Sequence, residues 1–174
     1  MTMAIRRATA DDASTLCALA ERTFVETFGH LYPPEDLADY LATAYPVALQ
    51  RQQLASGEYA AWLLEVEGEA VGFAFAGPCG LPHPDVVPGD GELKRLYVLR
   101  DHQSGGHGGQ LFAAALEWLQ ARDSQALWIG VWSENLGAQR FYGRYGFTHV
   151  GAYEFPVGRV RDREFILKRE RLVG

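Results

Sequence analysis

The most constraining feature of the sequence is a glycine-dense turn between an apolar strand and an amphipathic helix. The strand is predicted over residues 92–99 and the helix over residues 106–122, where leucine, phenylalanine and alanine recur at helical spacing. Four glycines occupy the five positions 105–109. Unpaired N–H groups and the positive end of the helix dipole converge at such a turn, which favours a phosphate ligand over a purely structural connection.

The spacing of the turn argues against two common phosphate sites. A P-loop places Lys-Ser or Lys-Thr directly after its last glycine, whereas Gly109 is followed by Gln110. A dinucleotide-binding fingerprint has a third glycine where Leu111 stands, and it belongs to an early βαβ unit. Neither an ATP-type nor an NAD-type site is therefore predicted here.

The elements around the turn follow from changes in the apolar period along the chain. Thr9 and Asp12 form a capping signal ahead of the first helix, and residues 77–91 hold four of the eight prolines, which predicts a loop. Because no repeat or linker interrupts the order, residues 1–174 are predicted to form a single mixed α/β (α+β) domain. The predicted elements are a strand at 4–8, helices ending near 28, starting near 34 and ending near 56, strands at 59–66, 70–76 and 92–99, a helix at 106–122, a strand at 126–132, a helix at 134–145, and strands at 147–155 and 160–168.

Composition restricts the function classes. The chain has 16 Lys and Arg against 22 Asp and Glu, and the formal charge of −6 argues against binding to nucleic acid or to an anionic membrane. Cys17 and Cys79 lack the spacing of a zinc or disulfide motif, and the histidines lack a ligand spacing, so no metal is predicted. The N-terminus is polar where a signal peptide would be apolar, which predicts a cytoplasmic protein.

Two linked motifs carry a family resemblance. The turn reads Gln103-x-x-Gly106-x-Gly108-x-x-Leu111, and one strand later the chain reads Asn135-x-x-Ala138-x-x-Phe141-Tyr142-x-x-x-Gly146-Phe147. Both motifs, and the order of elements over nearly the whole chain, resemble the GNAT superfamily of N-acetyltransferases. The departures are Gln103, where Arg is also usual, and His107, where an aliphatic residue is more frequent. The resemblance implies a central, mostly antiparallel twisted sheet of about six or seven strands flanked by helices, with acetyl-CoA in a cleft between the signature strand and the following strand.

The same resemblance implies a cofactor site. It assigns the coenzyme sulfur's proton donor to Tyr142, although the helical spacing of Tyr142 also suits core packing. It also makes the Val98 N–H the oxyanion donor, and it leaves Asn135 either in contact with the cofactor or as a helix cap. The implied cofactor-binding residues are Leu96, Val98, Gln103, Ser104, Gly105, Gly106, His107, Gly108, Asn135 and Tyr142.

Acetyl transfer to an amine also needs a proton acceptor. An alkylamine with a pKa of about 10.4 is almost fully protonated at neutral pH. Glu92 begins the signature strand and resembles the glutamate that many GNAT enzymes use there, so it is the predicted base, acting directly or through water. The alternative for Glu92 is a solvated carboxylate at the end of a strand.

The acceptor is predicted to be a small cationic amine. Aromatic rings attract alkylammonium groups. Two interpretations are open for Glu26, Glu35, Asp36 and Glu134: they add negative charge to the acceptor site, or they are the acidic residues that are common at helix starts. Residues 23–28, 34–37, 40–41 and 128–135 resemble bacterial Pai-type spermidine/spermine N-acetyltransferases, which implies a polyamine; a homodimer is a further expectation. The alternatives are a non-catalytic acyl-CoA sensor, or an enzyme for another small amine or a protein N-terminus. The predicted substrate-binding residues are Phe24, Phe28, Tyr32, Trp132 and Tyr153.

Overall fold

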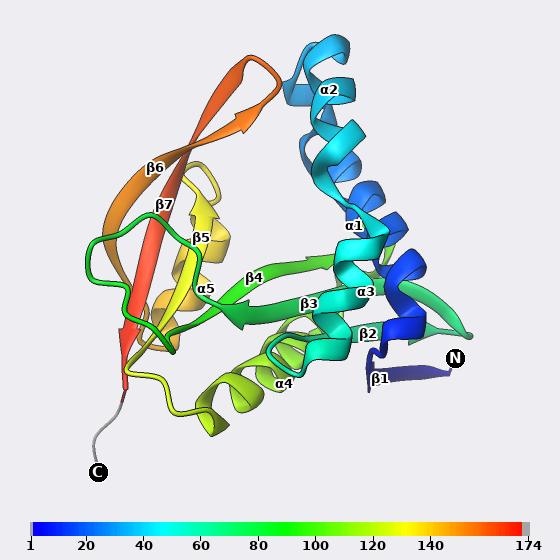
Figure 1. Cartoon of the computed structure of the whole chain (residues 1–174). Coiled ribbons are helices and arrows are strands. Elements are labelled where there is room, and N and C mark those ends of the chain that lie inside the picture. Colours follow the sequence, from blue (N-terminus) through cyan, green and yellow to red (C-terminus); the bar gives the residue numbers. More distant parts are fainter. Residues whose placement is uncertain (1, 172–174) are drawn as a thin grey trace.

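The computed structural model describes residues 2–171 and contains one seven-stranded sheet with helices on both faces (Figure 1). Short 3₁₀ turns at Ala10–Asp12, Gly29–Leu31 and Arg100–His102 join some of the elements. The helices and strands are β1 (Met3–Arg7), α1 (Ala13–Phe28), α2 (Pro34–Ala44), α3 (Val47–Ser56), β2 (Ala60–Val66), β3 (Glu69–Pro78), β4 (Gly91–Val98), α4 (His107–Ala121), β5 (Ala126–Trp132), α5 (Leu136–Arg144), β6 (Thr148–Val157) and β7 (Val160–Glu170).

The strand order is β1-β2-β3-β4-β5-β7-β6, and among the strands of residues 2–171 only the β4–β5 pair is parallel. Strand β5 lies between β4 and β7, as its apolar residues on both faces predict. The expected mostly antiparallel sheet of six or seven strands is therefore confirmed. All of the predicted helices and strands are present, with ends that differ by only a few residues.

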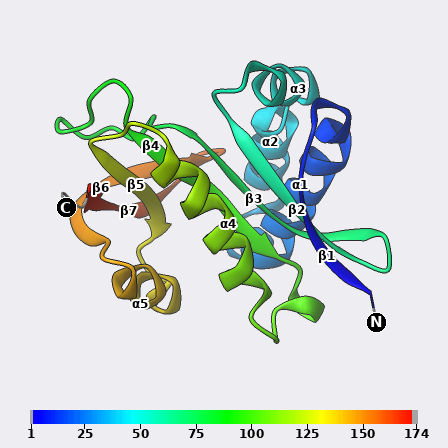
Figure 2. The ribbon, with the colours of Figure 1, turned by 90° about the horizontal axis from the view of Figure 1, so that it is seen from below.

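The helices divide between the two faces of the sheet. Helices α1, α2 and α3 cover one face, and α4 crosses the opposite face of β2, β3 and β4, with α5 beside the end of β5 (Figure 2). Leu111, Phe112, Ala115 and Leu119 of α4 are buried, as their spacing predicts, and they pack into the main core. None of the helices within residues 2–171 is both long and apolar enough to cross a membrane.

Strands β4 and β5 separate soon after they pair. Their register covers only residues 91–93 of β4 and 127–129 of β5. A bulge in β4, opposite Phe75 and Ala76 of β3, adds to the local distortion. Beyond residue 93 the edge of β4 that faces β5 has no strand partner within the described residues, and a wedge-shaped opening joins the two faces of the sheet.

Two long-range contacts fix the segments around this opening. Asp90 ends the proline-rich loop and accepts hydrogen bonds from the Ala126 N–H at 3.1 Å and the Trp128 indole at 2.9 Å. The turn of the β6–β7 hairpin docks on α2, because Asp36 accepts from the Arg159 N–H at 2.8 Å and from its Nε at 3.1 Å. Asp36 is only 2% exposed, whereas the Arg159 side chain that reaches it is largely exposed to solvent.

Candidate active site

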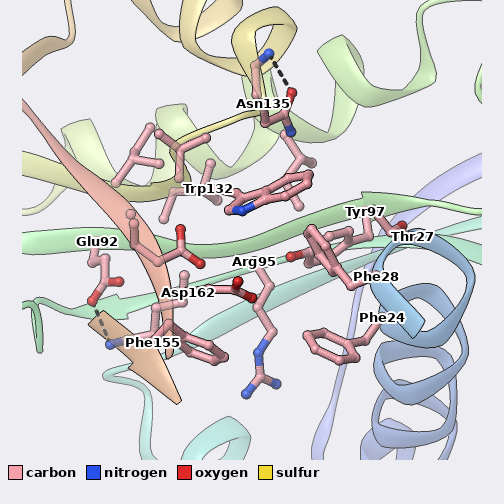
Figure 3. A pocket seen from close by; sticks show the side chains of 18 of the residues that line it. Phe24, Thr27, Phe28, Glu92, Arg95, Tyr97, Trp132, Asn135, Phe155 and Asp162 are labelled. Carbon is pink, nitrogen blue, oxygen red and sulfur yellow. Dashed lines mark hydrogen bonds and ion pairs between the residues drawn. The ribbon is translucent and has the colours of Figure 1, made fainter. Parts of the chain in front are cut away.

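A pocket of about 550 Å³ occupies the opening between β4 and β5. It reaches from the α4–α5 side of the sheet, at Gln103 and Asn135, to the α1–α2 side, at Phe24 and Asp162 (Figure 3). The two sides are called the cofactor side and the acceptor side below. A molecule bound on one side therefore has direct access to a molecule bound on the other.

The glycine turn forms the N-terminus of α4 beside the cofactor side. Gly106 is the N-cap with a φ of 79°, and within residues 2–171 no side chain caps the helix. A Cβ added at Gly108 or Gly109 would meet nothing within 4 Å, so the surface over the first turn is open. We call this open surface over the first turn of α4 the cradle. It fits a pyrophosphate whose oxygens accept hydrogen bonds from the backbone N–H groups of the turn.

The other residues of the turn support this shape. The Gln103 amide donates to the Val98 carbonyl at 2.9 Å, which ties the turn to the end of β4. The His107 ring lies against Gly105, and its Nδ1 is buried without a partner within the described residues. Of the ten predicted cofactor-binding residues, Leu96, Val98, Gln103, Asn135 and Tyr142 line the pocket, and residues 104–108 continue from it as the turn.

Tyr142 on α5 belongs both to the core and to the pocket. Its ring packs against Phe112 with centroids 5.6 Å apart and against Phe147 at 6.4 Å, and it is 8% exposed. Burial raises the pKa of its hydroxyl well above the ordinary value, so the phenol is protonated at neutral pH and remains able to donate. Core packing and pocket lining are therefore compatible in this residue.

Asn135 caps α5. Its side-chain oxygen accepts from the Ala138 N–H at 3.0 Å, as the second alternative for this residue predicts. The same side chain also lines the cofactor side (Figure 3), so the cap does not remove it from the pocket.

The acceptor side has aromatic walls. Phe28 bridges the opening, because its ring lies 5.5 Å from Trp132 of β5 and 6.4 Å from Tyr97 of β4 (Figure 3). Phe24 stacks on Tyr32 at 6.1 Å. The structure brings together all five predicted substrate-binding residues, namely Phe24, Phe28, Tyr32, Trp132 and Tyr153.

Glu92 also lines the acceptor side, where it is 7% exposed, so it is not a solvated carboxylate. Its Oε1 accepts from the Lys94 Nζ at 2.9 Å and from the Gly80 N–H at 3.0 Å. The bond from Gly80 holds the loop next to the strand, and the pair with Lys94 fixes the position of the carboxylate. The role of Glu92 as a base stays a prediction.

The expected acidic residues of the first helices do not line this pocket. Glu26 is bound to the backbone N–H of Arg100, and Glu35 and Asp36 face Arg159. Glu26, Glu35 and Asp36 thus hold neighbouring segments of the chain in place. The prediction that their charge contributes to the acceptor site is therefore wrong. Glu134 lies outside the lining as well.

Two other carboxylates, Asp162 and Glu164 of β7, supply the negative charge instead. Asp162 accepts a hydrogen bond from the Tyr32 hydroxyl. Burial, together with the nearby charge of Asp162, raises the pKa of Glu164 to about 7. One signal in the sequence could have found them, because alternation places both on the face of β7 that carries the buried Ile166.

Comparisons with known proteins agree with this geometry. A model of the Acetyltransferase (GNAT) family matches residues 16–147. The chain belongs to the GNAT family. An uncharacterised N-acetyltransferase of Lactobacillus delbrueckii subsp. lactis is 30% identical over 158 residues, which is 91% of each chain. One from Mycobacterium bovis is 28% identical over 166 residues, covering 91% of this chain and 97% of that protein.

Solved GNAT structures share the fold over almost the full length. The PaiA N-acetyltransferase from Thermoplasma acidophilum, in complex with coenzyme A, has a TM-score of 0.74 at 17% identity and covers 98% of this chain and 99% of that one. The ribosomal-protein-alanine N-acetyltransferase from Brucella melitensis has a TM-score of 0.71 at 24% identity, covering 96% and 99%. This GNAT protein is an acetyl-CoA-dependent N-acetyltransferase, and the open cradle at α4 fits that cofactor.

Proposed function

We propose that the protein transfers the acetyl group of acetyl-CoA to the primary amine of a small molecule by direct attack, with spermidine and spermine as the leading acceptors. The observation that carries this proposal is the continuous pocket between β4 and β5. It joins Gln103, which directly precedes the glycine turn, and Tyr142 on one side to aromatic rings and carboxylates on the other. An amine on the acceptor side can therefore reach a thioester that enters from the cofactor side.

Acetyl-CoA supplies an activated acetyl group when bound. The turn at residues 104–108 is proposed to hold its pyrophosphate, and backbone groups of Leu96 and Val98 its pantetheine arm. The Val98 N–H is proposed to stabilise the charge that develops on the carbonyl oxygen. Tyr142 is proposed to protonate the departing thiolate, which its protonated hydroxyl in the pocket supports.

The charges of the acceptor side support a cationic acceptor. Lys94 is paired with Glu92, and the Arg95 guanidinium lies 4.9 Å from the Tyr45 ring, at the end of the pocket opposite Asn135 (Figure 3). Asp162 is proposed to hold a distal ammonium of a polyamine while the terminal amine reacts. The fold shared with the PaiA protein is consistent with this proposal; a cytoplasmic location and a homodimer stay predictions.

Calorimetry with acetyl-CoA and an assay of free thiol across a panel of amines test the proposal. We expect tight acetyl-CoA binding and turnover of spermidine, with a KM that rises with ionic strength because salt screens the attraction between ammonium and carboxylate. An uncharged amine of similar length is expected to be a poor acceptor. Binding without turnover of any amine would favour an acyl-CoA sensor, and preference for a neutral or anionic amine would contradict the polyamine.

A further inference from the structure

Glu164 lies on β7 directly beside the end of β5. Its register partners are Trp132 on β5 and Tyr153 on β6. The Ser133 N–H donates to the Arg163 carbonyl at 3.0 Å, so β7 accompanies β5 to its last residue. Helix α5, which carries Tyr142, begins shortly afterwards. Glu164 and Tyr142 therefore line the same pocket, from the strand beside the end of β5 and from the helix that follows it.

Glu164 differs from the other carboxylates of the pocket because its side chain is not bound to another group of the protein within the described residues. Within residues 2–171 it has neither a side-chain hydrogen bond nor an ion pair, whereas Asp162 is bound to Tyr32 and Glu92 to Lys94. A partly buried carboxylate without a partner in the protein is satisfied by whatever enters the pocket beside it, which is water, a proton or a cationic ligand. An acceptor ammonium is such a ligand.

We propose that Glu164 is the general base that removes the ammonium proton of the acceptor; this role rests on the proposed transfer to an alkylamine. One proton passes from the ammonium to the Glu164 carboxylate, and the neutral nitrogen attacks the thioester carbonyl. The C–N bond forms and the C–S bond breaks, while the thiolate takes a proton from Tyr142. Tyr142 regains a proton from the attacking nitrogen, and Glu164 releases its proton to solvent.

The surroundings of Glu164 set the pH at which it can act. Burial and Asp162 raise its pKa to about 7, so its base form grows as the pH rises through neutrality. The cations Lys94 and Arg95 are engaged with Glu92 and with the Tyr45 ring. Burial raises the pKa of the tyrosines that face the pocket, which stay uncharged at neutral pH: Tyr32, Tyr40, Tyr45, Tyr97, Tyr142 and Tyr153.

Glu164→Gln tests the base with two acceptors, the fastest alkylamine of a panel that includes spermidine and phenethylamine, and aniline, which is uncharged at pH 7. We expect kcat on the alkylamine to fall about 100-fold, with loss of the acid limb of its pH profile near pH 7. The loss on aniline is expected to be much smaller, because aniline has no ammonium proton to remove. Glu154→Gln, an exposed carboxylate of β6, is the matched control and is expected to keep both activities.

Four results would overturn this assignment. An equal loss on both acceptors would make Glu164 a structural residue, and an acid limb that persists in Glu164→Gln would place the base elsewhere. Loss of the limb in Glu92→Gln instead would identify that residue as the base. A wild-type protein that binds acetyl-CoA but acetylates no alkylamine would overturn the proposed function as well, and only that result does so.

Discussion

At the scale of single residues, Tyr142 shows how one side chain can serve the core and the pocket. Its ring is packed by Phe112 and Phe147, so its position does not depend on its hydroxyl. Within residues 2–171 no group is hydrogen-bonded to that hydroxyl, which leaves it available to a ligand in the pocket. Removing the hydroxyl alone therefore separates the two roles.

Tyr142→Phe is expected to lower kcat about 100-fold and to change the affinity for acetyl-CoA little, since a proton donor to the thiolate acts mainly in the transition state. The melting temperature should stay close to that of the wild type, because the packing of the ring is retained. Steady-state kinetics, calorimetry and a melting curve provide these three values. Turnover equal to that of the wild type would reduce Tyr142 to a packing residue.

The acceptor residues show how far sequence reasoning reaches at this scale. The aromatic walls could be predicted, because Phe24 and Phe28 share a helix face and Trp132 ends a buried strand. The sequence could not show which carboxylates belong to the acceptor site. Asp36 holds a hairpin and Glu164 faces a cavity, but nothing in the sequence around them distinguishes these two roles. Only the tertiary neighbours distinguish the two cases.

At the scale of elements, the glycine turn and α4 act as one unit. Its position was predictable because the signals are local: a strand, four glycines and an amphipathic helix follow each other without interruption. The start of the first helix was predicted less accurately, because the Thr9–Asp12 capping box begins a 3₁₀ turn that precedes α1. Local signals thus predict elements better than their first residues.

Gly108→Val is expected to weaken acetyl-CoA binding by about tenfold or more, because the new side chain covers the N–H groups of the first turn. The fold should persist, since a Cβ at Gly108 meets nothing within 4 Å. Calorimetry on the folded variant measures the change. Gly143→Val, at another open helical glycine outside the pocket lining, is the matched control; equal affinities in both variants would exclude the turn from the site.

The hairpin of β6 and β7 carries Asp162 and Glu164, so its docking on α2 should matter for the acceptor. A Cβ at Gly158 would lie 2.5 Å from the Asp36 Cα, and the φ of Gly158 is 58°. Gly158→Ala is expected to destabilise the fold by at least about 2 kcal/mol and to raise the acceptor KM, because the hairpin must shift.

Gly68→Ala controls for backbone strain. Gly68 has a φ of 78° in the β2–β3 turn, but a Cβ there meets nothing within 4 Å. Gly68→Ala is expected to lower the free energy of unfolding by about 1 kcal/mol and to leave the acceptor KM unchanged. Denaturant unfolding and kinetics on both variants measure the difference, and equal costs at the two positions would mean that the docking of the hairpin adds nothing.

At the scale of the whole molecule, the pocket results from a sheet that pairs β4 with β5 over three residues and then opens. The spacing of apolar residues predicts which residues form each strand and each helix. It does not predict over how many residues two strands stay paired. The family resemblance implied a cleft between these two strands, and the structure shows which residues line its acceptor side. The residue patterns predicted the strands themselves, and the resemblance implied that most of them are antiparallel.

The carboxylates of the molecule also shape its stability as a function of pH. The pKa of Asp12 is lowered to about 2 by Arg6, and that of Asp36 is lowered by the hydrogen bonds from Arg159. These groups stabilise the fold above their unfolded pKa, and this contribution is lost as the pH falls. Glu164 acts in the opposite direction, because its pKa is raised from 4.5 to about 7 in the folded state.

Between these two values the folded protein binds more protons at Glu164 than the unfolded chain does, so this group lowers the free energy of unfolding as the pH rises. Glu164→Gln removes the effect, and the variant should therefore gain in melting temperature over the wild type as the pH rises from about 5 to about 8. The comparison cancels the contributions of Asp12 and Asp36, which both proteins share. Melting curves across this range measure the difference without any substrate. A difference that is the same at every pH would mean that the Glu164 carboxyl ionises as it does in water, which would remove the physical basis for a base that is poised near neutrality.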